Sequence, residues 1–385
     1  MRKNLMDKSL SLGIQNKTSE KNYYFRSFEL HCFVDKLIAE KQFAYIDKNY
    51  MLFKSQKTLQ VYELHIVVDS DSVDKLLEII DGQPIKQQHH IFREHTQSQV
   101  HNEYQIMNKT VFTAEHWPGT YVIVNNHTNF TLLIKDVSFF DERYAMYIIR
   151  EIIIKTAEKE NLLLLHAASL DIDGKTVLLA GDKGAGKTTM LCHLCANIKN
   201  TAPMSNDRTY IEDTGKELIA HYFPLKYRIS MDTVRLYDRM KNLLYMKYIT
   251  YKPNKAKALM DGTGNSKLSL LQEEFEHVFY KKGTAFGKLN ALFFLHLHLN
   301  SNILKYKKAS EEEIVELLNR NNLSYKDDLF IDDWIIKSNN LSVEEKQHEK
   351  TIQNIASKIK CYRIDYGSNI TGEELGSFIK DLLKE

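Results

Sequence analysis

The sequence is poor in cysteine. Its 385 residues contain only Cys32, Cys192, Cys195 and Cys361, which are too few and too scattered for a disulfide framework. Residues 1–8 also lack the apolar stretch of a secretory signal peptide. These two absences favour a cytoplasmic location.

Long apolar runs and an excess of one charge are also missing. No uninterrupted apolar run approaches the length of about 18 residues that a membrane-spanning helix needs, so the sequence predicts no membrane span. The 52 basic and 50 acidic residues leave a net charge of +2. Charge therefore gives no case for nucleic acid or an anionic membrane as a partner.

Length and local pattern divide the chain into four parts. At about 150 residues per domain, 385 residues predict two or three domains. Residues 1–20 form a polar leader and residues 21–137 a β-rich accessory domain. Residues 138–300 form an α/β core, and residues 301–385 form a helical segment packed on that core, with helices expected at 311–318 and 373–383.

The accessory domain is recognised by short runs of β-branched and aromatic residues with turn signals between them, such as Pro118 with Gly119. These runs predict a meander or hairpins, without a catalytic signature. Apolar residues at helical spacing over 139–158 predict an amphipathic helix that leads into the core. Strands are expected at residues 28–33, 60–68, 109–113, 121–124 and 130–134.

Residues 181–188 read Gly-Asp-Lys-Gly-Ala-Gly-Lys-Thr, a complete G-x-x-x-x-G-K-[ST] motif. The aliphatic run 175–180 before it predicts a strand, and residues 188–196 predict a helix. In that setting backbone amides surround a phosphate, Lys187 reaches the β- and γ-phosphates, and the Thr188 hydroxyl binds Mg²⁺. The motif predicts binding of Mg-ATP by Gly181, Asp182, Lys183, Gly184, Ala185, Gly186, Lys187, Thr188 and Thr189.

Phosphoryl transfer also needs an acid near the γ-phosphate, and Asp207 is the best candidate. The chain returns to the sheet after the helix that follows the motif, so Asp207 is expected at the end of the next strand. There it can hold Mg²⁺ or accept a proton from an attacking hydroxyl. The alternative is an ordinary turn residue beside Asn206. His166, at the end of the apolar run 162–165, is a second candidate, with a hydrogen-bonded core histidine as the alternative.

The order of these pieces resembles the kinase domain of HPr kinase/phosphorylase and the wider group of HPr-kinase-like proteins. The resemblance covers roughly residues 140–300: a His-Ala strand, a turn at Asp173 and Gly174, the motif, and an Asn-Asp-Arg return. It implies a P-loop core related to that of phosphoenolpyruvate carboxykinase. It also matches His166 to the family histidine near the reacting phosphate and Asp207 to the second acid of an Asp pair.

Asn206 departs from the family pattern, because it stands where the first acid is usual. An amide neither takes a proton nor brings a charge to a metal. The resemblance then implies that Asp207 acts as both base and metal ligand, with Thr188 as the other metal ligand, Lys187 stabilising charge and His166 steering Asp207. Arg208 matches an arginine of many members, and a structural role for it stays open.

The resemblance implies a Mg-ATP-dependent kinase. Its acceptor would be a hydroxyl, first on a Ser/Thr-type side chain of a peptide or protein and second on a small metabolite. The rival interpretation is a nucleotide-gated binding or assembly ATPase, which the amide at Asn206 keeps open. The sequence does not decide between ATP and GTP, or whether the chain forms a homo-oligomer.

Three other patterns are less specific. Cys192 and Cys195 have C-x-x-C spacing but fall inside the predicted helix, so packing is expected. His296 and His298 alternate with Leu on a predicted strand at 291–299 and share a face, but no third metal ligand is in view. A basic and tyrosine-rich stretch is typical of a mobile flap over the γ-phosphate or of a solvated helix face. It comprises Arg239, Lys241, Tyr245, Lys247, Tyr248, Tyr251, Lys252, Lys255, Lys257 and Lys267, with Gly262 and Gly264 as a flexible spot.

Overall fold

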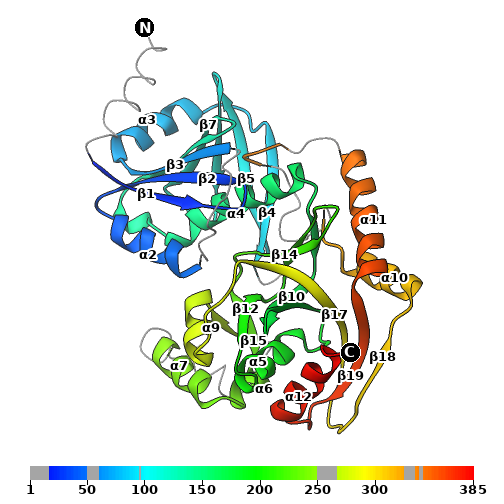
Figure 1. Ribbon diagram of the computed structural model, residues 1–385. Coiled ribbons are helices and arrows are strands. Elements are labelled where there is room, and N and C mark those ends of the chain that lie inside the picture. Colours follow the sequence, from blue (N-terminus) through cyan, green and yellow to red (C-terminus); the bar gives the residue numbers. More distant parts are fainter. Residues whose placement is uncertain (1–16, 50–59, 95–96, 249–266, 325–333, 338–340) are drawn as a thin grey trace. The chain divides into compact units, whose positions relative to one another are not determined.

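The structure is a computed structural model that describes residues 17–49, 60–94, 97–248, 267–324, 334–337 and 341–385 (Figure 1). It is a mixed α/β protein. Its described residues fall into two compact units, divided between Glu160 and Asn161. Residues 334–337 belong to the first unit, whereas residues 48–49 and 341–385 belong to the second. The predicted leader lies largely outside the described residues, and a strand begins at Thr18 within it.

The first unit contains a mixed sheet in which the strands run in the order β1-β2-β3-β8-β7-β6-β5-β4. Strands β2, β3 and β8 are parallel neighbours, and the other pairs are antiparallel. All five predicted strands are confirmed, but the parallel pairs are not hairpin or meander connections. The strands are β1 (Thr18–Tyr24), β2 (Phe28–Asp35), β3 (Gln60–Val68), β4 (Gln87–Glu94), β5 (Gln97–Ile106), β6 (Lys109–Ala114), β7 (Thr120–Asn126) and β8 (Asn129–Ile134).

Helices cover this sheet through apolar contacts. The helices are α2 (Ala39–Asn49), α3 (Ser70–Ile80) and α4 (Glu142–Lys159), with a short 3₁₀ turn at Val137–Phe139. Val73 and Leu76 of α3 pack into a buried cluster with Val111 and Leu133 of the sheet. Such burial contributes roughly 1.5–3 kcal/mol for each large aliphatic side chain.

Helix α4 confirms the predicted amphipathic helix but belongs to the first unit. Its Tyr144 ring stacks on the Trp117 ring with 4.6 Å between the ring centroids. The Tyr144 hydroxyl also forms a 2.8 Å hydrogen bond with His101 Nε2. Because these partners lie on or beside the first sheet, the division of the chain follows α4 instead of preceding it near residue 137.

The second unit contains a larger sheet with the strand order β12-β10-β11-β17-β14-β13-β9. Strand β19 pairs in parallel with β17 and antiparallel with β18, and β11 also runs parallel to β17. Figure 1 shows β17 and β19 side by side. The strands are β9 (Leu163–Leu165), β10 (Ala167–Ile172), β11 (Lys175–Ala180), β12 (Thr201–Ser205), β13 (Thr209–Asp213), β14 (Leu218–Tyr222), β17 (Phe286–His298), β18 (Leu304–Lys308) and β19 (Lys360–Gly367).

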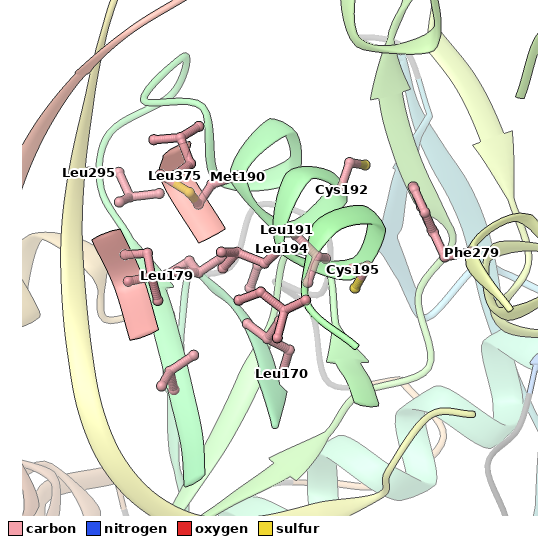
Figure 2. Packing of buried hydrophobic residues seen from close by; sticks show 14 of the residues in the cluster. Leu170, Leu179, Met190, Leu191, Cys192, Leu194, Cys195, Phe279, Leu295 and Leu375 are labelled. Atoms are coloured by element: carbon pink, nitrogen blue, oxygen red, sulfur yellow. The ribbon is translucent and has the colours of Figure 1, made fainter. Parts of the chain in front are cut away.

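Helix α5 (Lys187–Asn197) anchors the core of the second unit. Figure 2 shows Leu191 and Leu194 of α5 beside Leu170 of β10, within one buried cluster. Cys192 and Cys195 are fully buried in the same cluster and form no disulfide, which confirms the expectation that they serve packing. The helix is therefore held firmly against the sheet that carries its preceding loop.

The segment after residue 300 is not purely helical, contrary to the prediction. It contains the expected helices α10 (Glu311–Asn321) and α12 (Gly372–Leu382), and also α11 (Leu341–Lys358). Ser310 caps α10 in a capping box with Glu313. However, β19 of this segment enters the central sheet beside β17, because its Cys361, Tyr362 and Ile364 side chains are buried there.

The remaining elements form a small layer in the same unit. A two-stranded sheet joins β15 (Tyr227–Ser230) to β16 (Lys267–Leu270), with α6 (Met231–Arg235), α7 (Asp238–Tyr248) and α9 (Gln272–Phe279) nearby in sequence. The central part of the predicted basic flap, which includes Lys252, Lys255 and Lys257, lies outside the described residues. Within the described ranges, we find no helix whose length and hydropathy would let it cross a membrane.

Candidate functional site

The loop of residues 181–186 joins β11 to α5, as the motif predicts. Gly181, Gly184 and Gly186 have φ angles of +138°, +89° and +85°, which L side chains rarely adopt. A Cβ on Gly181 would lie 2.7 Å from the Leu295 carbonyl oxygen, and one on Gly186 would overlap the Tyr366 hydroxyl. Gly186 also caps α5 without a side-chain hydrogen bond, so backbone amides at this helix end can face an anion.

Lys187 is buried against the start of this loop. Its Nζ donates hydrogen bonds to the carbonyl oxygens of Gly181 at 2.7 Å and Asp182 at 3.3 Å. Burial lowers the pKa of Lys187, and the nearby carboxylates of Asp207 and Asp182 oppose that shift. The structure thus brings the motif lysine and Asp207 within electrostatic range of each other.

Thr188 and Asn206 form a direct pair. The Thr188 hydroxyl donates a 3.0 Å hydrogen bond to Asn206 Oδ1, and Asn206 is buried. The next residue, Thr189, bonds the Thr233 hydroxyl at 2.8 Å and so points to α6. Asn206 therefore supplies a neutral oxygen beside the predicted magnesium ligand Thr188.

Asp207 follows β12 by two residues, at the strand end where it was predicted. His166 Nε2 lies 3.1 Å from its Oδ1, and Arg208 donates to its Oδ2 at 2.5 Å. Burial raises the pKa of Asp207, but the His166 hydrogen bond and the charges of Arg208 and Lys187 outweigh burial and hold that pKa well below its usual range. The group is thus a fixed carboxylate that stays ionised at neutral pH.

His166 occupies the corner between β9 and β10. Its backbone N–H donates to the Asn321 carbonyl oxygen at 2.7 Å, which fixes the corner against the end of α10. Its side chain is 30% exposed, so the ring reaches solvent on one side while it bonds Asp207 on the other. This arrangement differs from that of an enclosed core histidine.

Within the described part of the predicted basic stretch, Lys267 interacts electrostatically with Asp207. Burial and the charge of Arg228 lower its pKa, and Asp207 opposes the shift from within electrostatic range. Lys241 and Lys247 instead pair with Asp238 and Glu274. Lys267, at the start of β16, is therefore a cation of this stretch that acts on Asp207.

Strand β19 contributes two features that the sequence did not predict. The Tyr366 hydroxyl of β19 donates a 2.9 Å hydrogen bond to the Gly186 carbonyl oxygen and so braces the loop. A cavity of about 470 Å³ borders the loop on residues 181–185 and is also lined by His296, Arg320, Arg363 and Asp365. Prediction of the parallel β17–β19 pair would have located both the Tyr366 contact and the cavity. However, residues 360–367 mix polar and apolar side chains, so the sequence did not indicate strand β19.

Comparisons with known proteins give little beyond this geometry. No protein-family model matches the sequence, and no curated protein matches it. Among solved structures, the Hpr(Ser) kinase/phosphatase from Coxiella burnetii is similar at 10% sequence identity and a TM-score of 0.25, covering 57% of this chain and 93% of that chain. This is a distant similarity, and it carries neither the activity nor the site residues of that protein to this chain.

Proposed function

We propose that the chain is an ATP-dependent kinase that transfers the γ-phosphoryl group to a hydroxyl acceptor. The observation that carries the proposal is the Asp207 carboxylate, held by His166 and Arg208 within electrostatic range of Lys187. Phosphoryl transfer needs a phosphate cradle, cations at the phosphates and an acid that orients the acceptor. The loop of residues 181–186, Lys187 and Asp207 are the residues that fill these three roles in the proposal.

The residues around Thr188 also fit Mg²⁺, which prefers oxygen ligands. Thr188 and Asp207 would hold the ion, and Asn206 Oδ1 lies 3.0 Å from the Thr188 hydroxyl as a neutral oxygen donor. When bound, the ion supplies positive charge that offsets the charge of the triphosphate. ATP itself would lie on residues 181–189, with the amides at the start of α5 directed at its phosphates.

The depressed pKa of Asp207 shapes its role. A carboxylate of low pKa is a weak proton acceptor, but a loose phosphoryl-transfer transition state demands orientation more than strong base catalysis. His166 and Arg208 hold both carboxylate oxygens, so Asp207 presents a fixed acceptor for the hydroxyl proton. The negative charge of a nearby triphosphate would raise the pKa of Asp207 and improve it as a base.

The proposed acceptor is a Ser/Thr-type hydroxyl on a peptide or protein, with a small hydroxylated metabolite as second choice. The resemblance of residues 140–300 to HPr-kinase-like proteins supports this order. Neither nucleic acid nor a membrane is part of the proposal, because the net charge of +2 gives no electrostatic case for a polyanionic partner.

The test is label transfer from γ-labelled ATP to panels of peptides and metabolites by the full-length chain. Asp207→Asn should lower transfer by roughly 10²-fold or more and keep ATP binding, because it removes the proton acceptor and leaves the loop intact. Asp381→Asn, which changes an exposed carboxylate on α12, is the matched control and should transfer normally. Equal transfer by wild type and Asp207→Asn would contradict the proposal.

One observation favours a second function, a nucleotide-gated binding or assembly ATPase. The Thr188–Asn206 hydrogen bond places an amide where the resembled kinases carry an acid. In that case wild type and Asp207→Asn would release phosphate at the same slow rate, and no acceptor would carry label. The same labelling experiment therefore separates the two functions.

A further inference from the structure

Three potential metal ligands meet at the ends of β17 and β19. His296 Nδ1 lies 3.1 Å from Asp365 Oδ1, and His298 Nε2 lies 2.8 Å from the same oxygen. The ligand atoms of the three residues all lie within 4.8 Å of one another. In tetrahedral zinc sites with bonds of about 2.0–2.2 Å, ligand atoms are about 3.3 Å apart, so the two His–Asp distances are already close to the spacing that a zinc site needs.

The pairing of β17 with β19 brings these three side chains together. His296 and His298 are two apart on β17 and therefore share one face of the sheet. Asp365 is the register partner of His296 on the parallel strand β19, which puts its side chain on that same face. Two rigid neighbouring strands thus hold the three groups, without any contribution from a loop.

The donor set indicates the class of metal. Two imidazole nitrogens with one carboxylate suit zinc and similar divalent transition metals, whereas Mg²⁺ and Ca²⁺ prefer oxygen donors. Three protein ligands also leave a fourth position for water or an anion. This set differs from Thr188 and Asp207, whose oxygen atoms suit Mg²⁺.

The surroundings give access from solvent, and cations that include Lys305 lie nearby. His296 is 67% exposed, and His298 and Asp365 are about a third exposed, so a metal ion can reach all three from solvent. Lys305 Nζ lies 4.0 Å from Asp365 Oδ2, and this cation would oppose a metal ion. Because Lys305 is itself 64% exposed, it can turn away into solvent when a metal binds.

We propose that His296, His298 and Asp365 form a binding site for one zinc-class divalent metal ion, separate from the magnesium ligands of the proposed kinase reaction. The site borders the cavity whose lining includes loop residues 181–185. A metal there places positive charge and an open coordination position beside the phosphate loop. Zinc binding does not depend on the kinase proposal, since none of the three ligands takes part in it.

The test is metal binding by the full-length chain after chelator treatment. Titration with Co²⁺, followed by visible d–d absorption, should show one tetrahedral site per chain that Zn²⁺ competes for. His296→Ala, His298→Ala and Asp365→Asn should each weaken Co²⁺ binding by at least roughly tenfold, because even second-shell changes cost 10–100-fold at metal sites. His296→Ala guards against misfolding as an explanation, since its side chain is largely exposed.

Two further variants test the effect of Lys305 on the site and the separation of the site from Asp207. Lys305→Gln should keep the Co²⁺ spectrum and bind the metal several-fold more tightly, because it removes the opposing charge. Asp207→Asn should bind Co²⁺ as wild type does, which separates this site from the magnesium ligands. Absence of tetrahedral bands in wild type, or unchanged affinity in all three ligand variants, would overturn the proposal.

Discussion

The Thr188 hydroxyl donates a hydrogen bond of 3.0 Å to Asn206 Oδ1. This pair joins the first turn of α5 to the connection after β12, and it puts an amide beside a proposed magnesium ligand. The connection continues directly into Asp207, whose carboxylate, like that of Asp182 in the loop, opposes the fall in the pKa of Lys187 that burial causes. Of the two residues that follow β12 directly, Asn206 and Asp207, only Asp207 therefore brings a negative charge to this part of the site.

Asn206→Asp should strengthen magnesium binding in the presence of ATP. The new carboxylate would occupy the position of the amide that now bonds Thr188, and it would add a negative charge to the oxygen donors around the ion. We expect the apparent Mg²⁺ affinity, measured by titration of ATP binding or label transfer, to rise several-fold. Asn206→Ala is the control, and a gain in that variant would show that charge is not the cause.

Gly186→Ala should destabilise the chain more than Gly184→Ala. Both glycines have positive φ, which costs an L residue about 1–2 kcal/mol. Only at Gly186 would the new Cβ overlap the Tyr366 hydroxyl, whereas a Cβ on Gly184 meets nothing within 4 Å. Urea unfolding should show a further loss of about 1–3 kcal/mol for Gly186→Ala.

The variant Tyr366→Phe tests whether the Tyr366 hydroxyl causes the extra destabilisation of Gly186→Ala. Tyr366→Phe removes the overlapping hydroxyl and also the hydrogen bond to the Gly186 carbonyl. In the double variant Gly186→Ala/Tyr366→Phe, the part of the lost unfolding free energy that comes from the overlap should be smaller. The part that comes from the positive φ angle should remain. Equal unfolding free energies for Gly184→Ala and Gly186→Ala would contradict the role of Tyr366 in bracing the loop.

The loop and its acid could be predicted because they depend on local chemistry. Glycine positions, the strand 175–180 and the helix that follows specify a phosphate loop without reference to the rest of the chain, and the structure places β11 and α5 there. The position of Asp207 at a strand end was predicted because the chain has room for one helix and one turn between the motif and that strand. Residue type and position indicated His166 and Asp207 separately, the resemblance implied that His166 steers Asp207, and the structure gives the 3.1 Å contact between them.

The features that were missed depend on pairing between distant strands. Residues 360–367 alternate buried Tyr362 and Ile364 with exposed Arg363, but their charged members masked this pattern. Without β19 there was no third ligand for His296 and His298, so a metal site could not be proposed. The placement of α4 was missed for a similar reason, since its aromatic contacts are with a sheet formed far earlier in the chain.

Acid should destabilise the wild type more than Asp207→Asn. The pKa of Asp207 is lower in the folded chain than in the unfolded chain, where it is about 3.9. The carboxylate therefore stabilises the fold above that value, and the stabilisation is lost as pH falls from about 4 through the folded pKa. Urea unfolding at pH 6, 4 and 3 should show the gap between wild type and variant narrowing toward low pH. A constant gap would mean that Asp207 is not held ionised by its neighbours.

His166→Asn should slow phosphoryl transfer without weakening ATP binding. The ring lies 3.1 Å from Asp207 Oδ1, so its loss frees one carboxylate oxygen to reorient and leaves the residues of the loop unchanged. We expect a fall in kcat of roughly tenfold or more with an unchanged Kd for ATP. Loss of the hydrogen bond from His166 also lets the pKa of Asp207 rise, so the acid limb of the rate profile should move to higher pH. A merely structural histidine would instead lower stability and leave the pH profile in place, and that result would remove His166 from the catalytic proposal while leaving Asp207 in it.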